Sequence, residues 1–105
     1  METRSHGKWA VIAVGGELDL YTAPQLRDAV LSLPRQDAPS VALDLTDVGF
    51  IDSSGLGEII SCLKHVRQLG GELALVTPPT SPLIKLLTLT GLDDALPTVA
   101  SVEEV

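Results

Sequence analysis

The chain of 105 residues contains little of several residue types, and each shortage excludes a class of protein. Cys62 is the only cysteine, so no internal disulfide can form, and a reducing cytoplasm is the expected compartment. No apolar run approaches the roughly 18 residues needed to span a bilayer. The N-terminal METRSHGKW also lacks the apolar stretch of a signal peptide. The sequence therefore predicts a cytoplasmic protein without a transmembrane helix.

Aromatic residues are also scarce, at 3% of the chain: Trp9, Tyr21 and Phe50. Hydrophobic residues nevertheless make up 45% of the sequence, so the core must be built from Leu, Val, Ile and Ala. A chain of 105 residues is near the common size of one domain and too short for two. We therefore expect residues 1–105 to form a single domain with one modest core.

Positive charge is the third shortage, because 7 Lys and Arg residues stand against 14 Asp and Glu residues, a formal net charge of −7. Nucleic acids and anionic membranes would repel such a chain, so neither is an expected partner. The acidic residues are scattered along the sequence, unlike those of a disordered acidic tail. They either keep the protein in solution or match a protein partner with a basic docking surface.

Apolar runs predict the strands of a central sheet. The segment WAVIAV is almost wholly apolar, as a strand covered on both faces would be, and Gly15-Gly16 ends it. Residues 5–8 are predicted to form a hairpin turn before this strand, and residues 46–49 a linker after a second central strand. The predicted strands cover residues 2–4, 9–14, 40–45, 72–77 and 96–100.

Apolar residues at helical spacing predict helices between these strands, each with one buried stripe. Thr22 and Gln25 make a capping box for the first helix, Pro24 suits its first turn, and Pro34 ends it. Gly70-Gly71 ends the second helix. The stripes comprise Leu26, Ala29, Val30 and Leu33 in the first helix and Leu56, Ile59, Ile60, Leu63 and Val66 in the second.

The C-terminal part of the chain repeats this pattern. Ser81-Pro82 starts a third helix that runs through Leu89, with Gly91 just past its end. Ser101 and Glu104 form a second capping box close to the last residue. The order is a strand pair followed by helix, strand, helix, strand and helix, which predicts an α/β fold with helices on at least one face of the sheet.

The segment FIDSSGLGEII, residues 50–60, joins a buried strand to the second helix. Asp52, Ser53 and Ser54 lie at the predicted helix start, where their side chains can accept hydrogen bonds from free backbone N–H groups. Gly55 and Gly57 leave the first turn bare, although each glycine inside a helix costs roughly 0.5–1 kcal/mol relative to Ala. The segment is therefore either a well-capped, tightly packed helix start or a surface that another protein approaches closely.

A serine at this helix start can also carry a phosphate. The N-terminus of a helix favours an anion by about 0.3–1 kcal/mol near the surface. A phosphoserine adds about −1.5 to −2 charges, which would have to be desolvated beside Asp52 if a partner covered this surface. A penalty of about 4 kcal/mol would weaken binding roughly a thousandfold. The geometry suits an on/off switch.

Three stretches, GGELDLYTAPQLRDAV, LDLTDVGFIDSSGLGEII and GGELALVTP, resemble the STAS domain family and, within it, the bacterial anti-sigma factor antagonists. The resemblance covers nearly the whole chain. D-S-S-G-L-G after an apolar strand is its most specific part, and E-L-D supports it. The resemblance implies a single α/β domain with a central mixed β-sheet of four to five strands and four to five α-helices.

The resemblance implies a regulatory protein rather than an enzyme. Family members of this kind bind an anti-sigma factor that is also a serine kinase, and so release the sigma factor. The kinase inactivates them by phosphorylating the serine directly after the aspartate, here Ser53, and a phosphatase restores them. ATP and magnesium would belong to the kinase, so this chain needs no cofactor of its own. The implied partner-binding positions are Asp19, Asp52, Ser54, Gly55, Leu56 and Gly57.

Other readings remain open for several of these residues. Asp19 can equally be a solvated loop acid, and Leu56 can belong to the core. S-S-G-L-G at a helix start could cradle a nucleotide phosphate, although the Lys and the glycine spacing of a P-loop are missing. The main alternative function is a STAS-like binding module in a signalling scaffold or transport system, whose partners ignore the state of Ser53.

Catalysis and metal binding fit the residues less well. A serine hydrolase needs a base beside its nucleophile, but His6 is predicted in a turn and His65 on the exposed side of the second helix. No glycine lies two residues before Ser53, as a nucleophile elbow requires. One cysteine and two distant histidines give no metal-ligand spacing.

Overall fold

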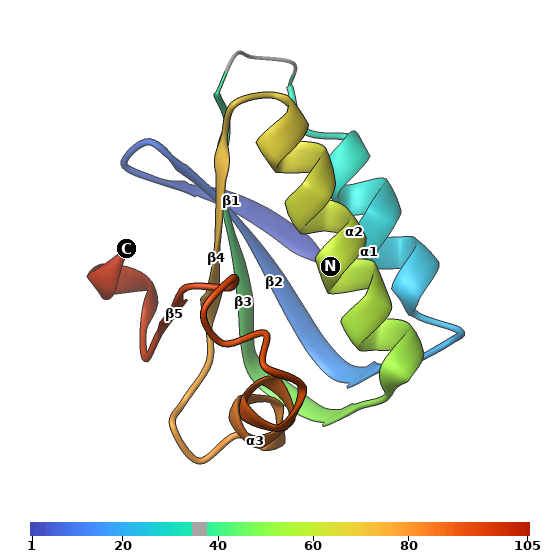
Figure 1. The fold of residues 1–105 in the computed structure, drawn as a ribbon. Helices are drawn as coiled ribbons and strands as arrows, with labels where there is room; N and C mark the ends of the chain where they lie inside the picture. The colour runs from blue at the N-terminus through green and yellow to red at the C-terminus, as the bar shows by residue number, and fades with distance from the viewer. Residues whose placement is uncertain (35–37) are drawn as a thin grey trace.

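The computed structural model describes residues 1–34 and 38–105 of the chain. Within these residues five strands form one sheet in the order β1-β2-β3-β4-β5 (Figure 1). β1 is antiparallel to β2, whereas the other neighbouring strands are parallel, so the sheet is mixed, as predicted. The strands are β1 Glu2–His6, β2 Trp9–Leu18, β3 Ser40–Ile51, β4 Glu72–Val76 and β5 Thr98–Val99.

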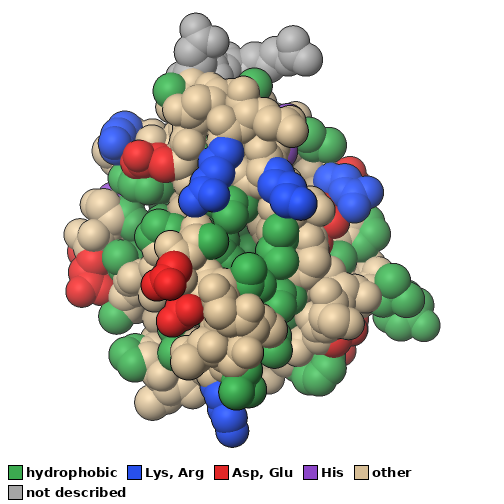
Figure 2. All heavy atoms as spheres, in the orientation of Figure 1, with side chains coloured by type: hydrophobic (Ala, Val, Ile, Leu, Met, Phe, Trp, Pro, Cys, Tyr) green, Lys and Arg blue, Asp and Glu red, His purple; other side chains and the backbone are tan. Residues whose placement is uncertain are grey.

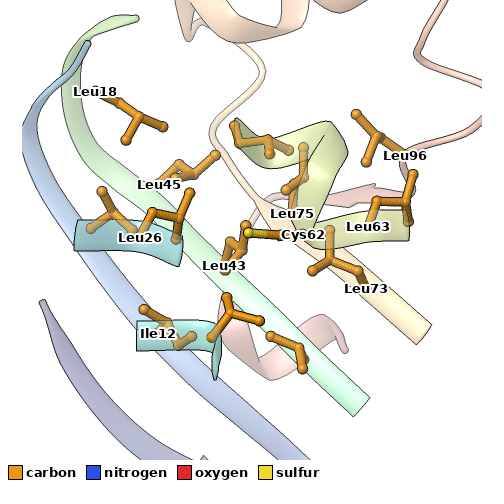
Figure 3. Packing of buried hydrophobic residues seen from close by; sticks show 14 of the residues in the cluster. Ile12, Leu18, Leu26, Leu43, Leu45, Cys62, Leu63, Leu73, Leu75 and Leu96 are labelled. Carbon is orange, nitrogen blue, oxygen red and sulfur yellow. The ribbon is translucent and has the colours of Figure 1, made fainter. Parts of the chain in front are cut away.

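Helices α1 (Ala23–Leu31) and α2 (Ser53–Gln68) lie side by side against one face of the sheet, and α3 (Pro82–Thr90) packs near its lower end (Figure 1). The main core fills the space between these helices and the sheet, and Figure 3 shows how its leucines meet around Cys62. Its fully buried members are aliphatic apart from Cys62, which confirms the prediction made from the shortage of aromatic residues. Each fully buried Leu or Ile contributes about 1.5–3 kcal/mol relative to leaving it exposed.

The opposite face of the sheet carries a smaller apolar cluster, formed by Val11, Ala42, Val76 and Val102. Val102 belongs to the 3-10 helix η1 (Val102–Glu104), which the predicted capping box of Ser101 and Glu104 begins. β2 therefore has buried side chains on both faces, as its apolar sequence predicted.

The predicted ends of β2 and β3 are wrong. Gly15-Gly16 does not end β2, and residues 46–49 are not a linker, because these two segments pair with each other and extend both strands. Register shifts between Ala13 and Gly15 and between Gly16 and Glu17 mark the pairing, and Gly16 has a φ of 73°. A glycine in this left-handed conformation is typical of a β-bulge, so here it bends the strand instead of ending it.

The structure has fewer α-helices than the four to five that the family resemblance implied: three among the described residues. Residues 92–96 form turns that stop at Pro97, whose ring cannot continue a helix, and η1 is a single 3-10 turn. The predicted ends of the third helix are confirmed. Ser81 caps its first turn through a 3.3 Å hydrogen bond from the Leu83 N–H, and Gly91 follows with a φ of 74°.

Candidate docking site at the start of helix α2

The predicted site residues come from two turns that lie next to each other at the carboxyl ends of β2 and β3. The Asp52 N–H donates to the Leu18 carbonyl oxygen at 3.3 Å, which joins the β3–α2 turn to the start of the β2–α1 turn. The carboxyl ends of parallel strands are the usual place for binding sites in α/β folds. Asp19, which follows Leu18, is thereby brought close to the serine pair that follows Asp52.

Asp52 is the N-cap of α2. Its Oδ1 accepts a hydrogen bond from the Gly55 N–H at 2.9 Å, and its backbone oxygen accepts from the Leu56 N–H at 3.0 Å. Ser53 is therefore free of the capping role and starts the helix with an exposed side chain, whereas Ser54 is half-buried. The predicted capping by Asp52 is confirmed, and the serine that follows it is accessible from solvent.

The two glycines of this helix start have different surroundings. A Cβ on Gly55 would lie 2.2 Å from the Leu18 carbonyl oxygen, so only glycine allows α2 to pack this closely on β2. A Cβ on Gly57 would meet nothing within 4 Å. Packing therefore explains Gly55, whereas the fold supplies no reason for Gly57.

Leu56 lies in the core with 7% of its surface exposed. Together with the buried Gly55, it positions the start of α2 and presents little surface of its own. Of the six implied partner-binding positions, Gly57 is exposed, and Asp19, Asp52 and Ser54 are half-buried.

Asp19 organises the β2–α1 turn. Its Oδ1 accepts hydrogen bonds from the backbone N–H groups of Tyr21 at 3.0 Å and Thr22 at 3.1 Å, and its carbonyl oxygen accepts from the Ala23 N–H at 2.8 Å. Desolvation acts to raise the pKa of Asp19, but the hydrogen bonds from Thr22 and Tyr21 outweigh it and lower the pKa below 3.8. Asp19 is thus an ionised acid that holds the turn.

The predicted capping box of Thr22 and Gln25 is wrong, because the Thr22 hydroxyl also belongs to the β2–α1 turn. Thr22 is the N-cap residue of α1, but its side chain makes no cap hydrogen bond. Its hydroxyl oxygen instead accepts from the Asp19 N–H at 2.9 Å and lies 2.8 Å from the Glu17 carbonyl oxygen, to which it donates. The Thr22 hydroxyl therefore stabilises the β2–α1 turn and does not make the α1 cap that the local sequence pattern predicts.

Three large apolar side chains project at this end of the sheet, Leu20 and Tyr21 from the β2–α1 turn and Phe50 from the end of β3. The sequence analysis did not assign them to the site. Leu20 is 65% exposed, Tyr21 84% and Phe50 51%. We call Leu20, Tyr21 and Phe50 the apolar rim. The signal available in the sequence was the scarcity of aromatic residues: two of the chain's three aromatics stand within a few residues of Asp19 or Asp52.

An ion pair between α1 and α2 was also missed. Arg27 donates from Nε to Glu58 Oε1 at 3.0 Å and from Nη2 to Oε2 at 2.8 Å, although Glu58 is only 6% exposed. Glu58 falls on the buried stripe of α2, and a polar residue at such a position signals a partner from a neighbouring element. The pair fixes α1, and with it the β2–α1 turn, against α2.

Cys62 follows Glu58 by one turn on the same buried side of α2. Burial, together with the nearby Glu58 carboxylate, raises the pKa of its thiol to about 12. The thiolate is the reactive form of cysteine, so this thiol is inert at neutral pH.

The two histidines lie away from Ser53. His6 ends β1 and pairs with Trp9 rather than lying in the predicted turn, and His65 is half-buried, about 18 Å further along α2 at 1.5 Å per residue. In residues 1–34 and 38–105, no three His, Cys, Asp or Glu side chains come together as metal ligands. None of the helices in these same ranges is long and apolar enough to cross a membrane.

With this fold and site, the chain belongs to the STAS domain family, whose family model matches residues 1–105. The predicted resemblance is therefore confirmed. The chain is 38% identical to the anti-sigma-B factor antagonist of Bacillus subtilis over 85 residues, which cover 81% of this chain and 76% of that protein. It is 36% identical to the anti-sigma-B factor antagonist of Listeria monocytogenes over 85 residues, or 81% of this chain and 74% of that one.

The fold also matches solved structures. An anti-sigma factor antagonist from Mycobacterium paratuberculosis superposes with a TM-score of 0.83 at 26% sequence identity, covering 98% of this chain and 86% of that one. The α/β class and the mixed sheet expected from the sequence are confirmed by this match and by the strand order.

Proposed function

We propose that this chain, acting as one STAS domain over residues 1–105, is an anti-sigma factor antagonist. In its unphosphorylated form it binds an anti-sigma factor that is also a serine kinase, and the sigma factor is released. Phosphorylation of Ser53 by that kinase inactivates it, and a phosphatase restores it. Family membership and the names of the relatives in Bacillus subtilis and Listeria monocytogenes support this proposal.

The observation that carries the proposal is the position of Ser53. It is the first residue of α2, its side chain is exposed, and Asp52 already caps the helix. A kinase can therefore reach the hydroxyl without unfolding the helix. The exposed Gly57, one turn further on, leaves room for the partner to approach the same surface.

Phosphorylation changes the charge of this surface while leaving the fold in place. The phosphate would stand beside the Asp52 carboxylate at the start of α2, where the helix N-terminus tolerates an anion in water. Under a bound partner the same phosphate loses its water next to another negative charge, which is unfavourable. The unphosphorylated serine has no such penalty, so the modification switches binding off.

The chain itself performs no catalysis in this proposal. ATP and magnesium belong to the kinase partner, and the reaction that this chain undergoes is the transfer of a phosphoryl group onto the Ser53 hydroxyl. The positions of His6 and His65 support a substrate role, because neither stands where a general base for Ser53 would have to be.

A pull-down from lysate of the source cells with Ser53→Ala and Ser53→Glu baits tests the proposal. The alanine bait should retain an anti-sigma factor kinase and the glutamate bait should lose it, with bound proteins identified by mass spectrometry. Ser61→Glu is the matched control, because Ser61 is exposed two turns further along α2 and adds the same charge away from the switch. The same partners on the alanine and glutamate baits would instead identify a binding module that ignores the state of Ser53.

A further inference from the structure

Exposed apolar side chains lie in the turn next to Ser53 and in the strand that leads to it. Leu20 and Tyr21 extend from the turn that the Leu18–Asp52 hydrogen bond holds beside the start of α2. Phe50 lies three residues before Ser53, within about 11 Å along the chain. A small apolar recess opens beside Phe50, walled also by Val48 and Pro82. Exposed aromatic side chains next to a recess are typical of protein–protein contacts.

Acidic residues surround the apolar rim. Glu17, Asp19, Asp47 and Asp52, which we call the acidic set, all come from the carboxyl-terminal parts of β2 and β3 or the turns that follow. Residues 15–26 and 46–57, which run from the carboxyl-terminal parts of β2 and β3 into the helices that follow, include no Lys or Arg. The neighbouring α3 carries a single basic residue, Lys85. This end of the molecule is therefore apolar and negatively charged at once.

Basic residues are gathered elsewhere. Figure 2 shows Lys and Arg side chains in a row across the upper part of the face that α1 and α2 present. The exposed basic residues of these helices are Arg27, Lys64 and Arg67. Lys64 and Arg67 stand in the C-terminal half of α2, about 16 Å or more from Ser53 along the helix axis. Arg27 stands nearer to Ser53, but its charge is paired with Glu58. The basic residues of α2 itself, Lys64 and Arg67, are therefore separated from the acidic set along the helix.

This separation of charges indicates what kind of partner can bind the acidic, apolar end of the molecule. A second copy presenting the same surface would place acid against acid, and a nucleic acid or an anionic membrane would be repelled. We propose that the apolar rim and the acidic set form one docking surface for a protein whose contact surface offers apolar recesses framed by Lys and Arg side chains. The inference rests on the proposed function, in which the anti-sigma factor is that protein.

The two sets of residues have different tasks in this docking. The apolar rim supplies the buried anchors, because large side chains near the centre of an interface carry most of its affinity. The acidic set steers the basic partner to this end of the molecule and raises the association rate. Ser53 starts α2 next to the β2–α1 turn. Under a bound partner a phosphate on it would lose its water even though the surrounding partner surface is basic.

Binding of the purified anti-sigma factor from the pull-down above, measured by surface plasmon resonance, tests the anchors. Tyr21→Ala should weaken binding by about 30-fold or more, and Phe50→Ala by about tenfold. Leu69→Ala is the matched control, because Leu69 is a half-exposed leucine just beyond the far end of α2, and it should change the affinity less than twofold. Thermal unfolding of each variant verifies that the fold is intact.

The same instrument tests the charges. Raising NaCl from 50 to 500 mM should lower the association rate constant by about tenfold, and Glu17→Gln with Asp47→Asn should remove most of that salt dependence. An Asp93→Asn and Asp94→Asn pair, which removes two charges from exposed positions after α3, should leave it unchanged.

An association rate that does not fall with salt, or a Tyr21→Ala variant that binds like the Leu69→Ala control, overturns the inference while leaving the Ser53 switch in place. Absence of any binding by the unmodified chain overturns the proposed function and this inference together. The two failures are therefore distinguishable in one set of measurements.

Discussion

Helix α2 has an inward side, packed on the molecule, and an outward side, facing solvent. Packing explains the choice of residues on the inward side but not on the outward side. Each inward residue meets the sheet, α1 or the main core, whereas the outward residues are small or polar and contact little. The inward residues include Gly55, Leu56, Glu58, Ile59 and Cys62, and the outward ones include Ser53, Gly57, Ser61, Lys64 and Gln68. A helix that needed only to be stable would carry alanine, not glycine and serine, on its outward side.

The comparison shows where function can be separated from stability in this protein. Changes on the inward side should alter folding first and binding as a consequence. Changes on the outward side near Ser53 should alter binding with little loss of stability. Glu58 differs from the other inward residues, because it is charged and yet buried.

The largest effect is expected from Arg27→Met, which leaves the buried Glu58 carboxylate without its partner. An uncompensated buried carboxylate costs about 3 kcal/mol, at the low end of the usual range because solvent reaches the Arg27 side of the pair. Urea denaturation should show this loss in the free energy of unfolding. Lys64→Met, which removes an exposed positive charge from α2, should change it by less than about 0.5 kcal/mol.

A double variant, Arg27→Met with Glu58→Met, tests whether the loss of stability comes from the unpaired Glu58 charge. It should regain most of the lost stability, because apolar side chains of similar volume can replace a buried ion pair. If Arg27→Met is no less stable than the Lys64→Met control, Glu58 does not depend on the pair, and the inward side of α2 is less tightly fixed than the structure indicates.

A slightly smaller effect is expected from Gly55→Ala. The added Cβ would overlap the Leu18 carbonyl oxygen, a backbone atom that cannot move aside without shifting β2. Overpacking of this kind costs about 1–3 kcal/mol, more than the helix gains from alanine. Thermal unfolding should show a lower Tm for the variant, and an unchanged or higher Tm would refute the close contact between α2 and β2.

The Leu18 contact also shows what the sequence could and could not predict. Local patterns were enough for the apolar stripe of α2, its Asp52 cap and the glycine that ends α3, because each depends on residues within a few positions. They failed at Gly15-Gly16 and at residues 46–49, where two polar segments pair across the sheet. A strand pairing between distant segments has no local signal.

The site was predictable to a similar degree. The motif directed attention to Asp52, Ser53 and Gly57, whose positions follow from the helix start itself. The roles of Glu58 and Thr22 were not accessible, because Glu58 meets Arg27 across 31 residues and the Thr22 hydroxyl serves the β2–α1 turn. The exposure of Tyr21 and Phe50 depends on where the turns lie, which only the folded chain specifies.

Gly57→Ala tests whether the outward side of α2 near Ser53 serves binding or only stability. Nothing lies within 4 Å of the added Cβ, so the variant should be more stable by about 0.5–1 kcal/mol, the helix preference of alanine over glycine. Under the proposed function, the same methyl group stands where the partner approaches, and binding of the anti-sigma factor should weaken. A variant that is more stable and binds equally well would show that the partner does not contact this turn.

The smallest effect is expected from Asp19→Asn, and it should depend on pH. Because folding lowers the pKa of Asp19 below 3.8, the charged carboxylate adds stability above this value, and that stability is lost as the pH falls through the folded pKa. Asp19→Asn should therefore have a lower Tm than the unmodified chain at pH 7, and the two values should converge as the pH falls below 3.8 and through the folded pKa. The Thr22 hydroxyl also lies 3.2 Å from Asp19 Oδ1, so its single proton is shared between that oxygen and the Glu17 carbonyl oxygen. Thr22→Val removes this contact and should raise the pKa of Asp19 in an NMR titration. A Tm difference that is the same at pH 7 and below the folded pKa would mean that the carboxylate's charge does not hold the turn, and that the β2–α1 turn keeps its shape through backbone contacts alone.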